Sequence, residues 1–166
     1  MSIEKIVIYT GLFDNYDSLN KPVYLNKNLE YICFTNNRKL KSKFWKIILL
    51  TEKESGIFLN RKIKLLPHLY LKMYRKSIYI DANIILLKNP MALISYLNNY
   101  DFVLFQHPLN HTYLNEIQIN YENKKINKLT YDNLLKKHSN YIFFNKLSTY
   151  SIPTNRILIR NHLNIE

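Results

Sequence analysis

The stretch "SIYIDANI", residues 77–84, has the character of a buried strand that ends on a carboxylate. Apolar residues lead up to Asp81, and Asn83 follows two positions later. One interpretation is structural, in which the polar end of the strand caps the next turn. The other is chemical, because side chains at positions i and i+2 of an extended segment project to the same side and can share a divalent cation.

The segment before this strand repeats with the period of a helix. Across residues 60–74, "NRKIKLLPHLYLKMY", apolar side chains recur every three or four positions at Ile63, Leu66, Tyr70 and Met73. This spacing predicts a helix with Asn60 as its N-cap. Pro67 lies inside the pattern and is expected to kink the helix or divide it in two.

Strand-like and helix-like segments alternate along the rest of the chain. Helical patterns cover residues 89–99 and 111–138, and apolar, β-branched runs predict strands over residues 5–10, 30–37, 44–50, 77–87, 101–107, 139–145 and 154–162. Such alternation predicts a single α/β domain over residues 1–166, Rossmann-like, with a mostly parallel central sheet flanked by helices.

Composition limits the function classes. The chain has 166 residues and a formal net charge of +12, from 24 basic and 12 acidic residues. Such an excess attracts nucleic acid, anionic membranes or phosphorylated small molecules. The basic residues are dispersed, and zinc-ligand spacings or helix-turn-helix patterns are missing, so we expect no specific nucleic-acid partner. Peripheral contact with an anionic membrane stays open.

Cysteine use and hydropathy predict a cytoplasmic location. Cys33 is the one cysteine, within an apolar run, which is typical of a reducing compartment. No run of apolar residues approaches the length of a membrane span. The N-terminal residues have the pattern of a strand and lack the cleavage site of a signal peptide.

Polar side chains follow several of the predicted strands. They comprise Asp14 to Asp17, Asn36 and Asn37, Asp81 to Asn83, and His107. In open α/β sheets ligands bind at the carboxyl ends of the strands, so these clusters predict a binding crevice at one sheet edge.

Six stretches, in this order, resemble the glycosyltransferase-like family named after plant turgor-regulation and mucilage proteins. They are "YTGLFDNYDSLNKP", "YICFTNN", "RKIKLLPHLYL", "SIYIDANI", "FQHP" and "RILIRNH", and together they run from about residue 6 to about residue 163. The layout also resembles GT-A glycosyltransferases such as glycogenin, in which a strand ends in an Asp-x-Asp motif.

The resemblance implies a GT-A fold and transfer of a sugar from a nucleotide-sugar donor, most simply a UDP-sugar, to a glycan or lipid-linked acceptor. It also implies Mn²⁺ or Mg²⁺ at the Asp-Ala-Asn motif, with Asp81 both a metal ligand and a catalytic residue and Asn83 a second ligand. His162, near the C-terminus, is a further candidate metal ligand. The family pattern has a carboxylate where Asn83 stands, and an amide is the weaker ligand for a hard cation. Members also continue beyond "IRNH" with a segment that bears Trp.

Donor binding is expected from two places. In GT-A folds the loop after the first strand holds the nucleoside, which makes Thr10, Asp14, Asn15 and Tyr16 candidates, with Tyr16 stacking on the base. An ordinary Asp/Asn turn is the alternative. Arg61 and Lys64 belong to a basic stripe and are candidates for the diphosphate, although such stripes are commonly solvated helix faces.

His107 and Glu116 are candidate catalytic residues, as a base or as a contact to the acceptor. Arg160 and His162 are further candidates for the diphosphate or the metal. Two rival interpretations remain open: a nucleotide- or glycan-binding remnant of the fold without catalysis, and a nucleic-acid-binding protein favoured by charge alone.

Overall fold

The computed structural model describes residues 5–109, 112–140 and 152–162. The chain divides into two compact units. The first comprises Met1–Val103 with Arg156–Glu166, and the second comprises Leu104–Asn155. Each unit is treated by itself below.

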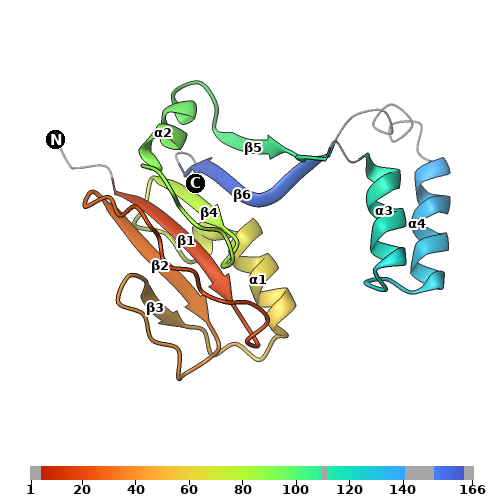
Figure 1. The fold of residues 1–166 in the computed structure, drawn as a ribbon, viewed down its shortest axis with the longest axis horizontal. Coiled ribbons are helices and arrows are strands. Elements are labelled where there is room, and N and C mark those ends of the chain that lie inside the picture. The colour runs from red at the N-terminus through yellow and green to blue at the C-terminus, as the bar shows by residue number, and fades with distance from the viewer. Residues whose placement is uncertain (1–4, 110–111, 141–151, 163–166) are drawn as a thin grey trace. The chain divides into compact units, whose positions relative to one another are not determined.

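The described residues form a six-stranded sheet in the order β3-β2-β1-β4-β6-β5 (Figure 1). The strands are β1 (Ile6–Leu12), β2 (Leu29–Thr35), β3 (Lys46–Leu49), β4 (Lys76–Ile80), β5 (Phe102–Gln106) and β6 (Pro153–Asn161). β1 pairs in parallel with β2 and β4, β2 pairs in parallel with β3, and β6 is antiparallel to β4. The predicted α/β class with a mostly parallel central sheet is therefore confirmed.

Helix α1 (Gly56–Leu65) connects β3 to β4 and begins earlier than its apolar period indicated. The prediction of Asn60 as N-cap is wrong: the Ser55 hydroxyl caps the helix and accepts a hydrogen bond from the Phe58 amide at 3.3 Å. The polar "TEKES" run hid this start because its residues carry no apolar period. Pro67 does divide the segment, since α1 ends at Leu65 and a separate 3₁₀ turn spans Pro67–Leu69.

One face of the sheet packs against α1. Strand residues such as Val7, Tyr9 and Tyr79 form a buried cluster with Leu59 and Ile63 of the helix. Tyr9 and Tyr79 meet edge to face with their ring centroids 5.3 Å apart. The helix therefore packs over β1 and β4. Its last turn lies close to the residue that follows β4, since Lys64 pairs with Asp81.

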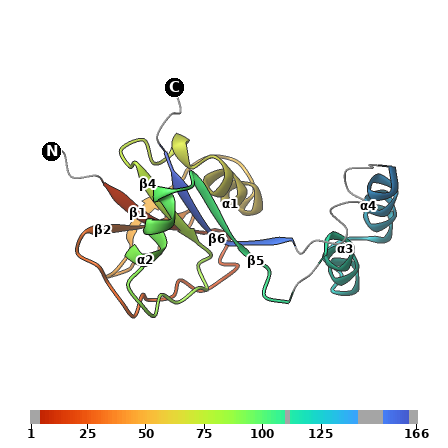
Figure 2. The ribbon, with the colours of Figure 1, turned by 90° about the horizontal axis from the view of Figure 1, so that it is seen from above.

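The opposite face of the sheet is covered by the segment after β4. Helix α2 (Met91–Ile94) and the 3₁₀ turn Ser95–Asn98 bury Ile94 and Leu97. Viewed from above, α2 lies on the other side of the sheet from α1 (Figure 2). Because both faces are covered, the central strands are apolar on both sides, which accounts for their continuous β-branched runs.

The strand prediction over residues 77–87 is too long. β4 ends at Ile80, and the Ile84 amide donates to the Asp81 carbonyl at 2.9 Å, which closes a turn immediately after the strand. The chain leaves the sheet at Asp81 because its polar side chain ends the apolar run.

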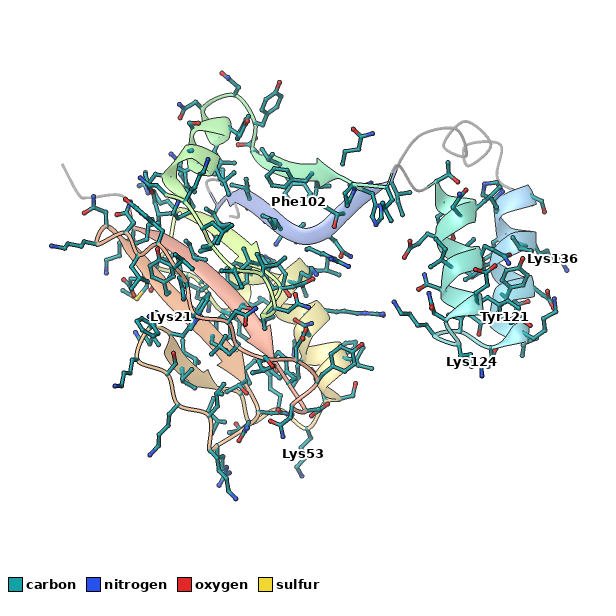
Figure 3. The ribbon with its side chains drawn as sticks, in the orientation of Figure 1. Lys21, Lys53, Phe102, Tyr121, Lys124 and Lys136 are labelled. Carbon is teal, nitrogen blue, oxygen red and sulfur yellow. The ribbon has the colours of Figure 1, made fainter. Side chains whose placement is uncertain are left out.

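The second unit contains a helical hairpin made of α3 (Tyr113–Glu122) and α4 (Lys128–Asn140). Its exposed side chains include Lys124 and Lys136, whereas Tyr121 is half-buried (Figure 3). The Tyr121 ring of α3 contacts the Tyr131 ring of α4, with 4.6 Å between their centroids and a tilt of 31° between their planes. The helical prediction for residues 111–138 is thus confirmed in its described part. In the strand predicted over residues 139–145, the first two residues end α4 and the others lie outside the described residues.

In the described part of the chain, no helix has the length and apolar character needed to cross a membrane. The predicted cytoplasmic location stays a prediction.

Gly11 permits the close approach of α1 to β1. A Cβ atom at this position would lie 2.5 Å from Ile63 Cδ1 and 2.8 Å from Asn60 Oδ1. We therefore expect Gly11→Ala to lower the free energy of unfolding by about 1–3 kcal/mol, measured by urea denaturation. Adding Ile63→Val, which removes the nearest atom, should cost less in the Gly11→Ala background than in the natural protein. Additive effects of the two substitutions would show that the helix does not depend on this contact.

Candidate functional site

The parallel strands bring three polar clusters to one sheet edge. In register, Leu12 of β1 lies opposite Thr35 of β2, and Tyr9 lies opposite Tyr79 of β4. The residues that follow these three strands therefore leave from the same edge, at their carboxyl ends. They are residues 13–17, residues 36–37 and residues 81–83.

Asp81 is the first residue after β4, and its side chain lies beneath α1. Its Oδ1 atom accepts from the Lys64 ammonium at 3.0 Å and from the Tyr79 hydroxyl at 2.9 Å. Oδ2 has no hydrogen-bond partner in the part of the chain that the structure describes. The Asp81 side chain is 25% exposed and that of Lys64 is 12% exposed. One carboxylate oxygen is thus held by the protein, and the other has no partner among the described residues.

Tyr79 acts as a fixed donor to this carboxylate. Burial and the neighbouring Asp81 carboxylate raise the pKa of its phenol, so the hydroxyl keeps its proton. The same oxygen lies 3.2 Å from Asn60 Oδ1, which comes from the middle of α1. The Lys64 ammonium also lies 4.6 Å from the centre of the Tyr79 ring. Lys64, Tyr79 and Asp81 therefore form one connected cluster.

Arg160 of β6 holds the end of α1. Its guanidinium donates to the Lys64 carbonyl, lies 3.4 Å from the Tyr9 hydroxyl, and rests 4.9 Å from the centre of the Phe102 ring. The structure thus places Arg160 as a support for the backbone of Lys64. A cation suits this position because the carbonyls at a helix C-terminus carry partial negative charge.

Arg156 lies across from Asp81 on the neighbouring strand and was missed by sequence reasoning. The Asp81 amide donates to the Arg156 carbonyl at 2.9 Å, one step beyond the pairing of Ile80 with Ile157. Residues paired in this way share a face of the sheet, so Arg156 lies on the Asp81 side. Arg156, Leu158 and Arg160 occupy every second position, which predicts that they share one face of a strand. The sequence does not reveal which strand pairs with that one.

Asn83 lies in the turn after β4, and its side chain is exposed. Its carbonyl accepts from the Asn20 side chain at 2.7 Å, which ties the turn to the long loop after β1. The backbone contact leaves the Asn83 carboxamide free of hydrogen bonds to the described residues.

Asp14 and Asn15 serve mainly to join loops. The Asp14 carboxylate accepts from the Asn36 amide nitrogen at 2.6 Å and from the Gly56 backbone amide at 3.0 Å, at the start of α1. The Asn15 side chain accepts from that of Asn37 at 2.8 Å. Both residues have a positive φ of 54°, a conformation that Asp and Asn adopt more readily than most residues.

The remaining donor candidates differ in exposure. Thr10 is fully buried within β1, whereas Tyr16 is 88% exposed on the loop. Arg61 is exposed on α1, one turn before Lys64. Their predicted roles in donor binding stay predictions, and of the three only Tyr16 and Arg61 are accessible to a ligand.

The structure does not bring His162 to Asp81. His162 follows β6, its amide donates to the Arg75 carbonyl, and its Nε2 atom lies 2.7 Å from Ser77 Oγ. Arg75 and Ser77 lie at the amino end of β4, whereas Asp81 follows its carboxyl end. Among the described residues there is no group of three or more His, Cys, Asp or Glu side chains placed to hold a metal.

His107 and Glu116 belong to the second unit. The His107 Nδ1 atom accepts from the Leu109 amide at 3.3 Å, and Glu116 Oε1 accepts from the Asn120 side chain at 3.1 Å. Thr112 caps the helix that carries Glu116. Their predicted catalytic roles stay predictions. His111, between them in the sequence, lies outside the described residues.

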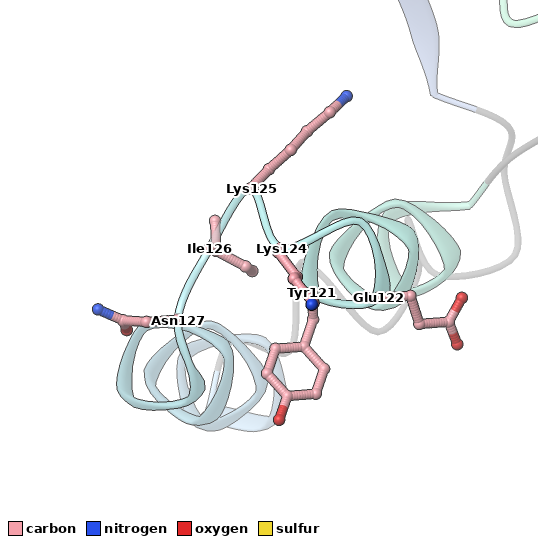
Figure 4. A pocket seen from close by; sticks show the side chains of 6 residues that line it. All are labelled: Tyr121, Glu122, Lys124, Lys125, Ile126 and Asn127. Carbon is pink, nitrogen blue, oxygen red and sulfur yellow. The ribbon is translucent and has the colours of Figure 1, made fainter.

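An open depression also occurs in the second unit, at the turn between α3 and α4 (Figure 4). It is lined by Tyr121, Glu122, Lys124, Lys125, Ile126 and Asn127. Its walls are largely flexible side chains of one turn, and it holds none of the predicted site residues. The sheet edge formed by residues 13–17, 36–37 and 81–83, called the Asp81 edge below, instead carries a carboxylate held by Lys64 and Tyr79.

Comparison with family models decides the family. The model described as TOD1/MUCI70, glycosyltransferase-like domain, matches residues 1–166. The chain belongs to this family. Searches of curated proteins and of solved structures gave no significant match. Membership in the TOD1/MUCI70 family supports a glycosyltransferase-type function, which in general requires a sugar donor and an acceptor.

The environment of His162 predicts a pH dependence of stability. Burial, with the nearby positive charges of Arg160 and His68, lowers the pKa of this imidazole to about 4. An unfolded histidine titrates near about pH 6.5. Between these values the unfolded chain binds more protons than the folded one, so the free energy of unfolding falls as the pH falls. We expect His162→Gln to flatten this dependence between pH 7 and pH 4, measured by urea denaturation at several pH values. Parallel curves for the two proteins would contradict the assignment.

Proposed function

We infer that the protein transfers a sugar from a nucleotide-diphosphate sugar to a hydroxyl acceptor, with the donor diphosphate bound at the Asp81 edge. The observation that carries this proposal is the position of Asp81. A carboxylate that is paired with Lys64 through one oxygen, and whose other oxygen has no partner among the described residues, follows a buried parallel strand in a member of a glycosyltransferase-like family.

The residues at this edge fit a divalent cation that arrives with the diphosphate. Asp81 offers one oxygen and Asn83 offers a carboxamide oxygen in an exposed turn. Mg²⁺, and Mn²⁺ by analogy, can bind through one or two protein oxygens plus phosphate oxygens and water, without a complete protein cage. When bound, such a cation would stabilise the negative charge on the departing diphosphate as a Lewis acid.

The cations of the edge suit the same diphosphate. Lys64 is already fixed beside Asp81, and Arg61 lies exposed one turn earlier on α1. Arg156 lies on the Asp81 side of β6. Arginine can bind phosphate oxygens in a bidentate manner, and lysine serves as a point charge. Together they would offset the charge of the leaving group.

The nucleoside would lie toward the loop after β1. Tyr16 is exposed there and can stack on a base. Asp14 and Asn15 would act mainly by fixing this loop, since their side chains bind Asn36, Gly56 and Asn37. Uridine diphosphate is the first nucleotide to test, as the resemblance to GT-A enzymes implies.

In the reaction, the acceptor oxygen forms a bond to the anomeric carbon of the sugar. The bond from that carbon to the diphosphate oxygen breaks, and the nucleoside diphosphate leaves with the electron pair. The acceptor hydroxyl gives its proton to a base. Lys64 and the arginines would stabilise the charge that develops on the diphosphate.

The test is ligand-induced stabilisation. With Mn²⁺ and UDP together near 100 times Kd, we expect the melting temperature of the natural protein to rise by about 5–10 °C, because only the folded state binds them. Asp81→Ala should abolish the rise. Asp132→Ala, which removes an aspartate paired with Lys128 at 2.9 Å in the helical hairpin, is the matched control and should keep it.

No stabilisation with any common nucleoside diphosphate would overturn the donor site. Stabilisation that survives Asp81→Ala would place the nucleotide elsewhere. Slow hydrolysis of a UDP-sugar, dependent on metal and on Asp81, would distinguish an enzyme from a nucleotide-binding remnant of the fold.

A further inference from the structure

Lys64 occupies a position that competes with a metal ion. Its ammonium lies 3.0 Å from Asp81 Oδ1, as close as a hydrogen bond requires. A divalent cation on the same carboxylate would meet a positive charge that is already in place. The two cations cannot both interact with this carboxylate without mutual repulsion.

The Lys64 side chain is restrained at this position. It is only 12% exposed, and its ammonium also lies over the Tyr79 ring. Arg160 donates to the Lys64 carbonyl and fixes the backbone from which the side chain extends. A lysine on a solvated helix face has none of these contacts. The ion pair between Lys64 and Asp81 is therefore held in place by the surrounding fold.

The charges of this edge disfavour a bare cation and favour an anion. Asp81 is neutralised by Lys64, and Arg160 adds a further positive charge next to the same helix turn. A divalent ion alone would raise a local charge that is already positive. A diphosphate brings negative charge with the metal, and its oxygens are acceptors that the Lys64 ammonium can take in place of Asp81.

We propose that Lys64 is an electrostatic latch that makes metal binding depend on the nucleotide. Without ligand, Lys64 holds Asp81 and keeps divalent cations out. When a metal and a diphosphate arrive together, Lys64 donates to the diphosphate and Asp81 becomes available to the metal. This proposal rests on the donor site proposed above, and it adds the order and coupling of binding.

The test measures Mn²⁺ binding without nucleotide, from the electron paramagnetic resonance signal of free Mn²⁺. We expect weak binding to the natural protein and binding about tenfold or more tighter to Lys64→Met, because the competing charge is gone. Lys64→Gln is a second variant with the same expectation and a polar side chain, should Lys64→Met fail to fold. The double variant Lys64→Met with Asp81→Asn should lose the gain.

Lys72→Met is the matched control. Lys72 is exposed and its removal changes the net charge by the same amount, so a general charge effect would appear in both variants. The latch requires a gain for Lys64→Met alone. Equal Mn²⁺ affinity in Lys64→Met and the natural protein, or an equal gain in Lys72→Met, would overturn it.

Adding UDP separates this proposal from the donor site. The natural protein should bind Mn²⁺ more tightly with UDP, and the Lys64→Met protein should show a smaller enhancement. Enhancement that is unchanged by Lys64→Met would overturn the latch and leave the donor site intact. If UDP affects Mn²⁺ binding in none of the variants, the donor site is overturned. Tighter binding of Mn²⁺ alone to Lys64→Met would then still show that Lys64 and the metal compete for Asp81.

Discussion

The ion pair between Lys64 and Asp81 is the interaction on which the geometry of this edge depends. Both side chains are largely buried, and removing one partner would leave an uncompensated charge. The pair joins the last turn of α1 to the end of β4. It therefore connects the helix that carries Lys64 with the strand that precedes Asp81, and it fixes the orientation of the carboxylate.

Contacts from three strands, β1, β4 and β6, support the ion pair between Lys64 and Asp81. Gly11 lets α1 lie close to β1, Tyr79 donates to Asp81 from below, and Arg160 holds the Lys64 carbonyl. These residues come from different strands that only the folded sheet brings together. These contacts fix the positions of Asp81 and of the Lys64 backbone. The loop after β1 is more exposed and carries Tyr16.

Local sequence was sufficient to locate the six described strands and the fold class, because buried parallel strands are continuous apolar runs, and Pro67 marks the end of a helix. It extended β4 beyond Ile80 and predicted a strand over residues 139–145 whose first two residues end α4. It also located Asp81 and Lys64. It misplaced the start of α1, since Ser55 caps from within a polar run without periodicity. The sequence analysis also associated His162 with Asp81. The antiparallel pairing of β6 with β4 instead places His162 beside the amino end of β4, whereas Asp81 follows its carboxyl end. Arg156 was missed for the same reason, because strand pairing is a long-range property.

The most direct test of the central claim is the location of the metal. Mn²⁺ with UDP, added to ¹⁵N-labelled protein, broadens the amide signals of nearby residues, and Mg²⁺ with UDP serves as the diamagnetic control. Binding at the carboxyl end of β4 predicts that residues 81–84 and Lys64 lose their signals first, whereas Arg75 and His162 at the other end of the strand broaden less. Broadening centred on His162, or on residues 123–127 of the helical hairpin, would contradict a donor site at Asp81.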